Sequence, residues 1–436
     1  MTENLKVGLI ALGCEKNRID AEIMLASLEN SGFEICAEES ECDVIIVHTC
    51  AFIDSAKEES IENILAAAEQ KKTGKCKKLI VTGCLAERYR NEITQSIPEV
   101  DAVLGTKSYD KITEAINKSD GKKYEHYRSL DKASPAGQRV LSSPNYSVYL
   151  KIAEGCSNHC SYCVIPSLRG EFMPRKFAEV VAEAEALAAN GAVEINLIAQ
   201  DTTAYPDLCR LVRRIAKIET VKWIRILYCR PEELTDEIIN LFATEEKLVK
   251  YMDIPLQHAS EHVLKLMNRP MSDGELKALI LKLRSRIAGV SLRTTFIAGF
   301  PHETEEDFEI LCNFVKDARF NNLGVFTYSR EDGTKAGRMR GQTDEETKRR
   351  RADIIMGIQN TLLESVNKDF IGKTFDVLCE GYDEEKELFC GRAYFQAPDV
   401  DGKIYFSSED PAEEGEFYRV RLDVYDSYDF YGKAVM

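Results

Sequence analysis

The first part of the chain alternates short apolar runs with amphipathic stretches. Apolar positions spaced three and four apart predict helices over Asp20–Asn30 and Ser55–Lys71. Four short apolar runs predict strands: Lys6–Leu12, Asp43–Val47, Lys78–Thr82 and Ala102–Leu104. Strands that alternate with helices form a parallel sheet covered by helices. Residues 1–120 are therefore predicted to be an α/β domain with a parallel sheet.

A second strand–helix series follows a polar segment, residues 121–145, which we interpret as a linker that can hold one extra strand. Helical patterns follow most strands of this series, and a long one over Glu345–Lys368 leads to the end of the chain. The predicted strands are Val148–Ala153, Glu194–Ile198, Trp223–Leu227, Tyr251–Pro255, Arg293–Ile297 and Gly324–Tyr328. Six such units predict a partial (β/α)6 barrel over residues 146–370, open on one side.

From residue 371 the alternation becomes shorter. Brief runs separated by turn residues predict a small antiparallel β-barrel over residues 371–436: Phe375–Cys379, Gly391–Phe395, Lys403–Phe406 and Tyr418–Val424. The fold class predicted for the whole chain is multidomain α/β, with this small barrel at its end.

Composition and charge narrow the function classes. The 57 basic and 73 acidic residues give a net charge of −16, so no overall attraction to nucleic acid or to an anionic membrane is expected. Neither a long apolar segment nor a basic leader is present, and we predict a cytoplasmic protein without membrane contact. In a reducing compartment, 14 cysteines point to metal binding or catalysis rather than to disulfides.

The strongest chemical signal is the C-x₃-C-x₂-C cluster of Cys156, Cys160 and Cys163, directly after the first barrel strand. Three thiolates within eight residues select an iron–sulfur cluster or zinc. Three ligands would leave one iron of a [4Fe-4S] cluster open to a small molecule. The alternatives are a zinc site completed by His159 or a distant group, and ordinary buried cysteines.

A second set consists of Cys14, Cys50 and Cys84, each within a few residues of the end of a predicted strand. The carboxyl ends of parallel strands form the ligand crevice of an open sheet. These cysteines are therefore predicted to meet there and to hold a second cluster; the alternative is three unrelated buried cysteines.

Polar residues and a glycine recur near the ends of the barrel strands. Gln200 follows the second strand, Gln257 the fourth, Arg293 opens the fifth, and Gly299 ends it. As a set they are candidates to bind a nucleoside cofactor, although each is individually more often a cap or turn residue. No side chain is assigned an acid–base role.

The cysteine cluster resembles that of the radical S-adenosylmethionine superfamily, and residues 5–436 are similar to its methylthiotransferases. Within that family the chain most resembles the branch that modifies small-subunit ribosomal protein 12. The resemblance rests on six segments: LGCEKNRIDAEIML (12–25), HTCAFIDSAKEESI (48–61), YLKIAEGCSNHCSYCVIPSLRG (149–170), IAQDTTAY (198–205), MDIPLQHAS (252–260) and TTFIAGFPHETEEDF (294–308). The chain departs from the family pattern at Glu15, His48, Pro206 and His302, none of which is a predicted ligand.

The resemblance implies two [4Fe-4S] clusters and S-adenosylmethionine as cofactors. Cys156, Cys160 and Cys163 would hold the radical cluster, with Tyr162 beside the adenine, and the three N-terminal cysteines would hold the cluster that presents sulfur. It further implies a C-terminal TRAM domain, an electron donor as partner, and a methylthio group added to the β-carbon of an aspartate in ribosomal protein 12.

The charge of residues 371–436 bears on the choice of substrate. Seven Lys and Arg stand against sixteen Asp and Glu, which suits a basic ribosomal protein and argues against nucleic-acid binding through this domain. The alternatives are a solvated acidic face, a tRNA adenosine methylthiotransferase and, from another class, a non-catalytic iron–sulfur electron carrier.

Overall fold

The computed structural model describes residues 5–119, 121–135 and 137–435, which divide into two compact units. The N-terminal unit comprises Met1–Pro144, Ala153–Arg175 and Glu331–Thr334; the barrel unit comprises Asn145–Ile152, Lys176–Arg330 and Lys335–Met436. The segment that carries Cys156, Cys160 and Cys163 thus belongs by compactness to the N-terminal unit. The domain boundaries expected from the sequence, which place it with the barrel, stay predictions.

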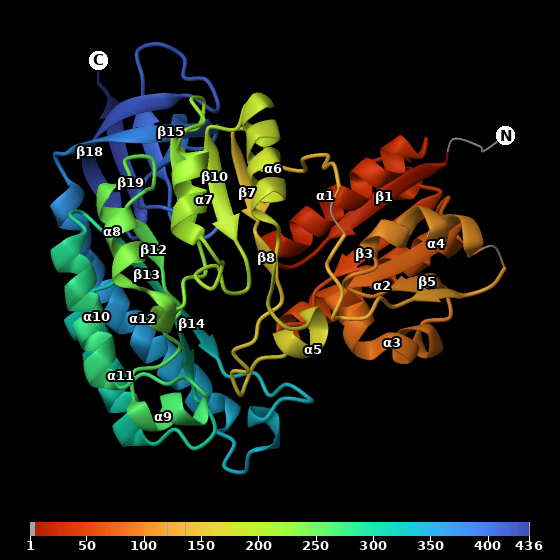
Figure 1. The fold of residues 1–436 in the computed structure, drawn as a ribbon, viewed down its shortest axis with the longest axis horizontal. Helices are drawn as coiled ribbons and strands as arrows, with labels where there is room; N and C mark the ends of the chain where they lie inside the picture. The colour runs from red at the N-terminus through yellow and green to blue at the C-terminus, as the bar shows by residue number, and fades with distance from the viewer. Residues whose placement is uncertain (1–4, 120, 136, 436) are drawn as a thin grey trace. The chain divides into compact units, whose positions relative to one another are not determined.

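The N-terminal unit is built on a six-stranded, fully parallel sheet (Figure 1). Its strand order is β2-β1-β3-β4-β5-β6. The strands are β1 (Lys6–Ala11), β2 (Glu34–Ile35), β3 (Val44–Thr49), β4 (Lys78–Gly83), β5 (Val100–Leu104) and β6 (Tyr124–His126). The predicted parallel sheet is confirmed, and β6 is the extra strand expected in the linker.

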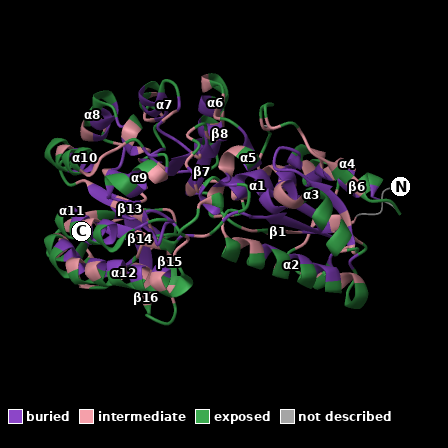
Figure 2. Cartoon of the chain, turned by 90° about the horizontal axis from the view of Figure 1, so that it is seen from below, coloured by how far each residue is buried: buried purple, intermediate pink, exposed green. Residues whose placement is uncertain are grey.

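Helices cover both faces of this sheet. Met24 and Leu28 of α1 (Glu15–Asn30) pack with Ile112 of α4 (Ile112–Lys118) in one core. On the other face, α2 (Asp54–Thr73) and α3 (Cys84–Ser96) pack over β3 and β4 together with α5 (Ile165–Arg169). Figure 2 shows the sheet strands buried and the outer side of α2 exposed.

The barrel unit contains six parallel strands in two three-stranded sheets, ordered β11-β10-β7 and β12-β13-β14. A parallel bridge from Ile224 to Leu248 continues the first sheet toward the second. The strands are β7 (Ser147–Lys151), β10 (Glu194–Ile198), β11 (Trp223–Ile226), β12 (Tyr251–Asp253), β13 (Ser291–Ala298) and β14 (Asn322–Thr327). All six lie where the apolar runs predict them.

Seven helices are described in this unit: α6 (Phe177–Ala189), α7 (Leu208–Ile215), α8 (Asp236–Thr244), α9 (Glu261–Leu266), α10 (Asp273–Arg286), α11 (Glu305–Ala318) and α12 (Glu345–Asn367). Capping boxes fix two of their starts, Ser272 with Glu275 at α10 and Thr304 with Asp307 at α11. Among the described residues, no helix has an apolar stretch long enough to cross a membrane.

The chain ends in a closed five-stranded barrel with the order β15-β16-β17-β19-β18. Its strands are β15 (Thr374–Asp383), β16 (Leu388–Ala393), β17 (Ile404–Ser407), β18 (Phe417–Asp426) and β19 (Asp429–Ala434). Only β17 and β19 pair in parallel. Val377, Phe406 and Phe430 lie in its apolar core. The predicted small barrel is confirmed, with β19 as an additional strand.

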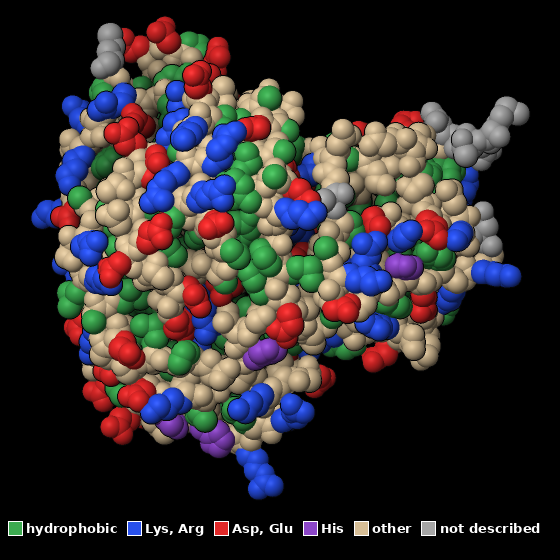
Figure 3. All heavy atoms as spheres, viewed as in Figure 1, with side chains coloured by type: hydrophobic (Ala, Val, Ile, Leu, Met, Phe, Trp, Pro, Cys, Tyr) green, Lys and Arg blue, Asp and Glu red, His purple; other side chains and the backbone are tan. Residues whose placement is uncertain are grey.

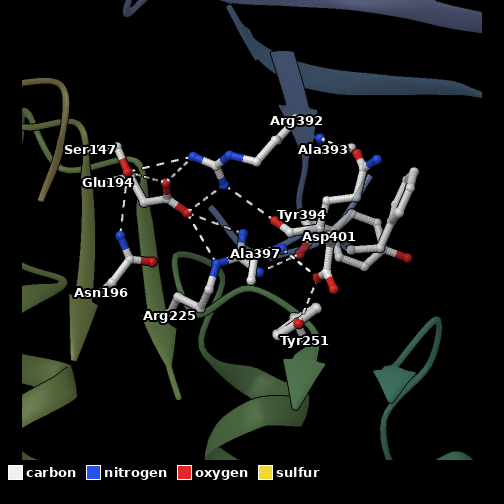
Figure 4. A network of polar contacts seen from close by, with 12 residues as sticks. Ser147, Glu194, Asn196, Arg225, Tyr251, Arg392, Ala393, Tyr394, Ala397 and Asp401 are labelled. Atoms are coloured by element: carbon white, nitrogen blue, oxygen red, sulfur yellow. Dashed lines mark hydrogen bonds and ion pairs between the residues drawn. The ribbon is translucent and has the colours of Figure 1, made fainter. Parts of the chain in front are cut away.

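A buried polar network joins this small barrel to the strands of the partial barrel (Figure 4). The Glu194 carboxylate on β10 lies 2.7 Å from Nη2 of Arg392 on β16 and 3.1 Å from Nη2 of Arg225 on β11. The Ser147 hydroxyl also donates to this carboxylate, at 2.7 Å. Burial opposes ionisation of Glu194, but the two guanidinium groups outweigh it and lower its pKa to about 2. Arg392 further pairs with Glu380, so two buried cations meet two carboxylates.

Candidate functional site

Cys14, Cys50 and Cys84 lie after the carboxyl ends of three neighbouring strands, β1, β3 and β4. In this strand order the connection changes direction between β1 and β3, and open α/β sheets bind ligands at that position. Cys14 and Cys50 flank it, and Cys84 begins the helix after the next strand. The structure therefore brings the second predicted set to one edge of one sheet.

Close backbone packing holds these cysteine turns together. Gly13 adopts a φ of +91°, and a Cβ there would lie 2.7 Å from Cβ of Cys50. The Asn17 amide donates to the Leu12 carbonyl at 2.9 Å and to the Thr49 carbonyl at 3.1 Å. Because Leu12 precedes Gly13 and Thr49 precedes Cys50, Asn17 fixes the Cys14 turn against the Cys50 turn.

The three thiols differ in exposure. Cys14 is exposed, whereas Cys50 and Cys84 are buried. Burial raises the pKa of the Cys50 thiol and that of the Cys84 thiol, the latter to about 12, while the Arg169 guanidinium acts in the opposite direction on both. A thiol binds a metal as the thiolate, so a cation at this edge would replace these protons.

Cys156, Cys160 and Cys163 lie on a loop that a short antiparallel ladder closes. Ala153 and Glu154 of β8 pair with Pro174 and Met173 of β9. Within the loop the Cys156 amide donates to the Gly170 carbonyl at 3.0 Å.

Two donors point at the sulfurs of this loop. The Asn158 amide lies 3.3 Å from Sγ of Cys156, and the Ile165 backbone N–H lies 3.4 Å from Sγ of Cys163. Such hydrogen bonds stabilise the negative charge of thiolate ligands. His159, the zinc ligand considered above, is exposed, and its Nε2 lies 3.2 Å from the Glu171 carboxylate.

Sequence patterns did not reveal Arg169, the last residue of α5. Its side chain is buried and reaches Asp20 at 2.7 Å, Glu154 at 3.3 Å, Asn17, and Sγ of Cys84 at 3.6 Å. One guanidinium thus contacts two carboxylates, an amide and a predicted cluster ligand. Its charged partners lie 15 and 149 positions away, so no local pattern shows that these side chains meet.

The donor chemistry fits the cofactor that these cysteines predict. Both sets are thiolates, which iron–sulfur clusters use. In the described ranges no group of three or more His, Cys, Asp and Glu side chains is arranged around a single metal ion. Each set offers three cysteines, which would leave one iron of a four-iron cluster open to another ligand.

The candidate cofactor contacts are distributed between the units. Tyr162 is half-buried on the cysteine loop, whereas Gln200, Gln257 and Gly299 follow the carboxyl ends of β10, β12 and β13 in the barrel unit. The Gln257 backbone exchanges hydrogen bonds of 2.8 Å with Thr295 and Ile297, which places it beside the end of β13. Their role in cofactor binding stays a prediction.

Arg293 and Gly299 have other partners in the structure. Arg293 is the third residue of β13, near its opposite end, and pairs with Asp253 at 2.9 Å and with Asp401 of the C-terminal barrel at 3.5 Å. Gly299 has a φ of +74°, and a Cβ there would lie 2.3 Å from Cγ of Lys348. The surroundings of Arg293 are those of a structural ion pair, and the absence of a Cβ at Gly299 allows α12 to approach.

Comparison with known proteins gives three family matches. Residues 6–105 match the uncharacterized protein family UPF0004, residues 150–315 the radical SAM superfamily, and residues 371–435 the TRAM domain.

Curated relatives match over the full length. The chain is 46% identical to the ribosomal protein uS12 methylthiotransferase RimO of Clostridium botulinum, over 99% of this chain and 98% of the relative. It is 45% identical to the protein of the same name from Lachnoclostridium phytofermentans, over 99% of this chain and 100% of the relative. Among solved structures, the fold is similar to the radical S-adenosylmethionine methyltransferase TsrM of Kitasatospora setae, with a TM-score of 0.56 and 15% identity over 77% of this chain and 74% of that chain.

Proposed function

Because the chain belongs to the family of ribosomal protein uS12 methylthiotransferases, RimO, we propose that it adds a methylthio group to the β-carbon of an aspartate in small-subunit ribosomal protein uS12. The observation that carries the proposal is that one compact unit holds both three-cysteine sets. A radical enzyme that only cleaves its cofactor needs one cysteine set. An enzyme that also inserts sulfur needs a second centre, which the second set would hold.

The cysteines divide the work between two centres. Cys156, Cys160 and Cys163 hold the radical [4Fe-4S] cluster, and Cys14, Cys50 and Cys84 hold a second one. When bound, the clusters and S-adenosylmethionine supply one-electron chemistry, the sulfur atom and the methyl group. The chain itself binds and orients: Asn158 and the Ile165 N–H stabilise the charge on two sulfurs, and Asn17 fixes the turns of two others. An electron donor is required as a partner.

The acidic C-terminal barrel is proposed to meet the basic substrate protein. Figure 3 shows acidic side chains at the outer tip of this part of the barrel unit, with Lys and Arg side chains among those below the tip. Exposed members lie in the β15–β16 turn and in the segment before β18: Glu384, Glu385, Glu387, Glu409, Asp410, Glu413 and Glu414. Complementary charge steers encounter and raises the association rate, and the same charge repels the phosphates of RNA. A ribosomal substrate also agrees with the predicted cytoplasmic location.

Mass spectrometry of an anaerobic reaction tests the proposed activity. The cluster-reconstituted full chain is incubated with a reductant, S-adenosylmethionine and the aspartate-containing loop of uS12. A methylthio group on the aspartate is the expected result. Formation of 5′-deoxyadenosine with an unmodified peptide would contradict the substrate and make tRNA adenosine the next one to test. With both clusters verified, absence of both products would contradict the enzyme and favour an electron carrier.

The charge of the acidic barrel has its own test. Replacing Glu384, Glu385 and Glu387 by Lys is expected to slow association with uS12, most strongly at low salt, where screening is weakest. Replacing three exposed acids elsewhere, Glu58, Glu59 and Glu62 of α2, serves as the matched control. Equal association rates for both variants would show that the acidic barrel only contributes solvation.

A further inference from the structure

Arg169 connects the two cysteine sets through a short piece of chain. It lies six residues after Cys163, at the end of α5, and its guanidinium reaches Cys84 at the end of β4. The residues beside it are fixed as well. The Leu168 carbonyl accepts a hydrogen bond of 2.6 Å from the Thr106 hydroxyl, and a Cβ on Gly170 would lie 2.4 Å from the Leu130 carbonyl oxygen. The backbone is therefore held in place on both sides of Arg169.

The contacts of Arg169 involve both terminal nitrogens of its guanidinium group. Nη1 donates to Asp20 and Glu154, and Nη2 donates to Asn17 and to Sγ of Cys84. With 2% of its surface exposed, the guanidinium acts on these groups with little screening by water. Only arginine offers five donors in a rigid plane, so lysine retains the charge but loses the geometry.

A positive charge and an N–H donor beside a ligating sulfur both favour the more negative, reduced form of an iron–sulfur cluster. We propose that Arg169 is a positioning residue with two effects: it fastens the Cys156–Cys163 loop to the N-terminal sheet, and it raises the reduction potential of the cluster that Cys84 helps to hold. The inference rests on the second cluster of the proposed function. It adds that the loop of one cluster sets the electron affinity of the other.

A redox titration of the second cluster alone tests this role. In the full chain with Cys156, Cys160 and Cys163 replaced by Ala, only the N-terminal cysteines contribute a cluster signal. The midpoint potential is followed by electron paramagnetic resonance after anaerobic reconstitution. Arg169→Gln is expected to shift the potential to a more negative value, and Arg169→Lys to shift it less because the charge remains.

A matched control separates this effect from the loss of any buried ion pair. Arg139 pairs with Glu22 at 2.7 Å in the same unit, with side-chain exposures of 5% and 1%, and among the described residues the partner of its guanidinium is this carboxylate rather than a cysteine. Arg139→Gln is expected to keep the potential of the parent chain. Loss of iron from Arg169→Gln alone, with unchanged circular dichroism, would also support the proposal, since Cys84 would then lack its support.

Three results would overturn it. An unchanged potential in Arg169→Gln, with iron fully retained, would leave the second cluster intact and remove the role of Arg169. Equal loss of iron from Arg169→Gln and Arg139→Gln would show a general effect of buried pairs. Absence of iron from the parent chain with Arg169 intact would contradict the second cluster itself, and the proposal with it.

Discussion

The carboxylate of Glu194 offers the sharpest test of how the C-terminal barrel is attached. It is fully buried, and its hydrogen-bond partners come from three strands: Ser147 on β7, Arg225 on β11 and Arg392 on β16. The change Glu194→Gln keeps the shape and removes the negative charge. Two buried guanidinium groups then lose a common counter-ion, and such a loss is strongly destabilising.

The lowered pKa of Glu194 gives the size of the expected loss in unfolding free energy. A fall from the ordinary 4.5 to about 2, at about 1.4 kcal/mol for each pKa unit, corresponds to about 3 kcal/mol of unfolding free energy at neutral pH. Removal of one partner of a buried pair costs about 3–5 kcal/mol in other proteins, which agrees. Because the folded pKa is depressed, this stability is present above about pH 4.5 and is lost as the pH falls toward 2.

Trp223 provides the assay. It is the only tryptophan, and its ring lies 4.7 Å from that of Phe417 in the C-terminal barrel, so its fluorescence reports on this attachment. Urea denaturation of the full chain is expected to lose about 3 kcal/mol in Glu194→Gln at pH 7 and to lose less relative to wild type near pH 3. Glu185→Gln, which breaks an exposed pair with Arg214, is the control and is expected to lose about 0.2–1 kcal/mol. Equal losses in the two variants, or a loss independent of pH, would refute the reasoning.

Three further predictions concern the cysteine sets. Cys160→Ala is expected to abolish 5′-deoxyadenosine formation, measured by chromatography, because the radical cluster loses a ligand; retained formation would contradict its role. Cys50→Ala is expected to lose methylthio transfer while cofactor cleavage largely remains, and normal product by mass spectrometry would remove the second cluster from the reaction. Gly13→Ala, with a Cβ 2.7 Å from Cβ of Cys50 and a φ of +91°, is expected to lose iron from the second cluster. Gly32→Ala is the control and is expected to retain it, because Gly32 has a similar φ of +84° but open space around it. Equal iron content in the two variants would refute the packing argument.

Much of the fold follows from local patterns. The apolar runs that become β10 and β13 are bounded by turn or cap residues, and each belongs to a buried parallel sheet, so their hydrophobicity is sufficient to locate them. Helix α3 was not anticipated because its sequence is polar and its backbone leaves helical geometry at Tyr89 and Arg90. Strand β19 was missed because the run predicted from the sequence ends at Val424 and only a two-residue turn separates β18 from β19.

The candidate site also shows what local sequence patterns can and cannot predict. Cys14, Cys50 and Cys84 were found because the end of each strand is visible locally and parallel strands share an edge. Arg169 was not found, since its significance comes from Asp20, 149 positions away, and from Cys84, 85 positions away. Buried polar partners of this kind are fixed by tertiary packing, which periodicity does not encode.

The N-terminal unit is discontinuous in sequence, and this delays its complete folding during synthesis of the chain. Its last segment contributes Glu331, whose carboxylate lies 2.9 Å from Nζ of Lys57 and 2.6 Å from Nη1 of Arg88. These two cations emerge from the ribosome first, and their acidic partner follows roughly 240–270 residues later, on the order of 10–50 s at about 5–20 residues per second. Until Glu331 is made, Arg88 lacks this carboxylate and Lys57 pairs with Asp54, at 2.5 Å, so the N-terminal unit reaches its final form only when most of the chain has been translated.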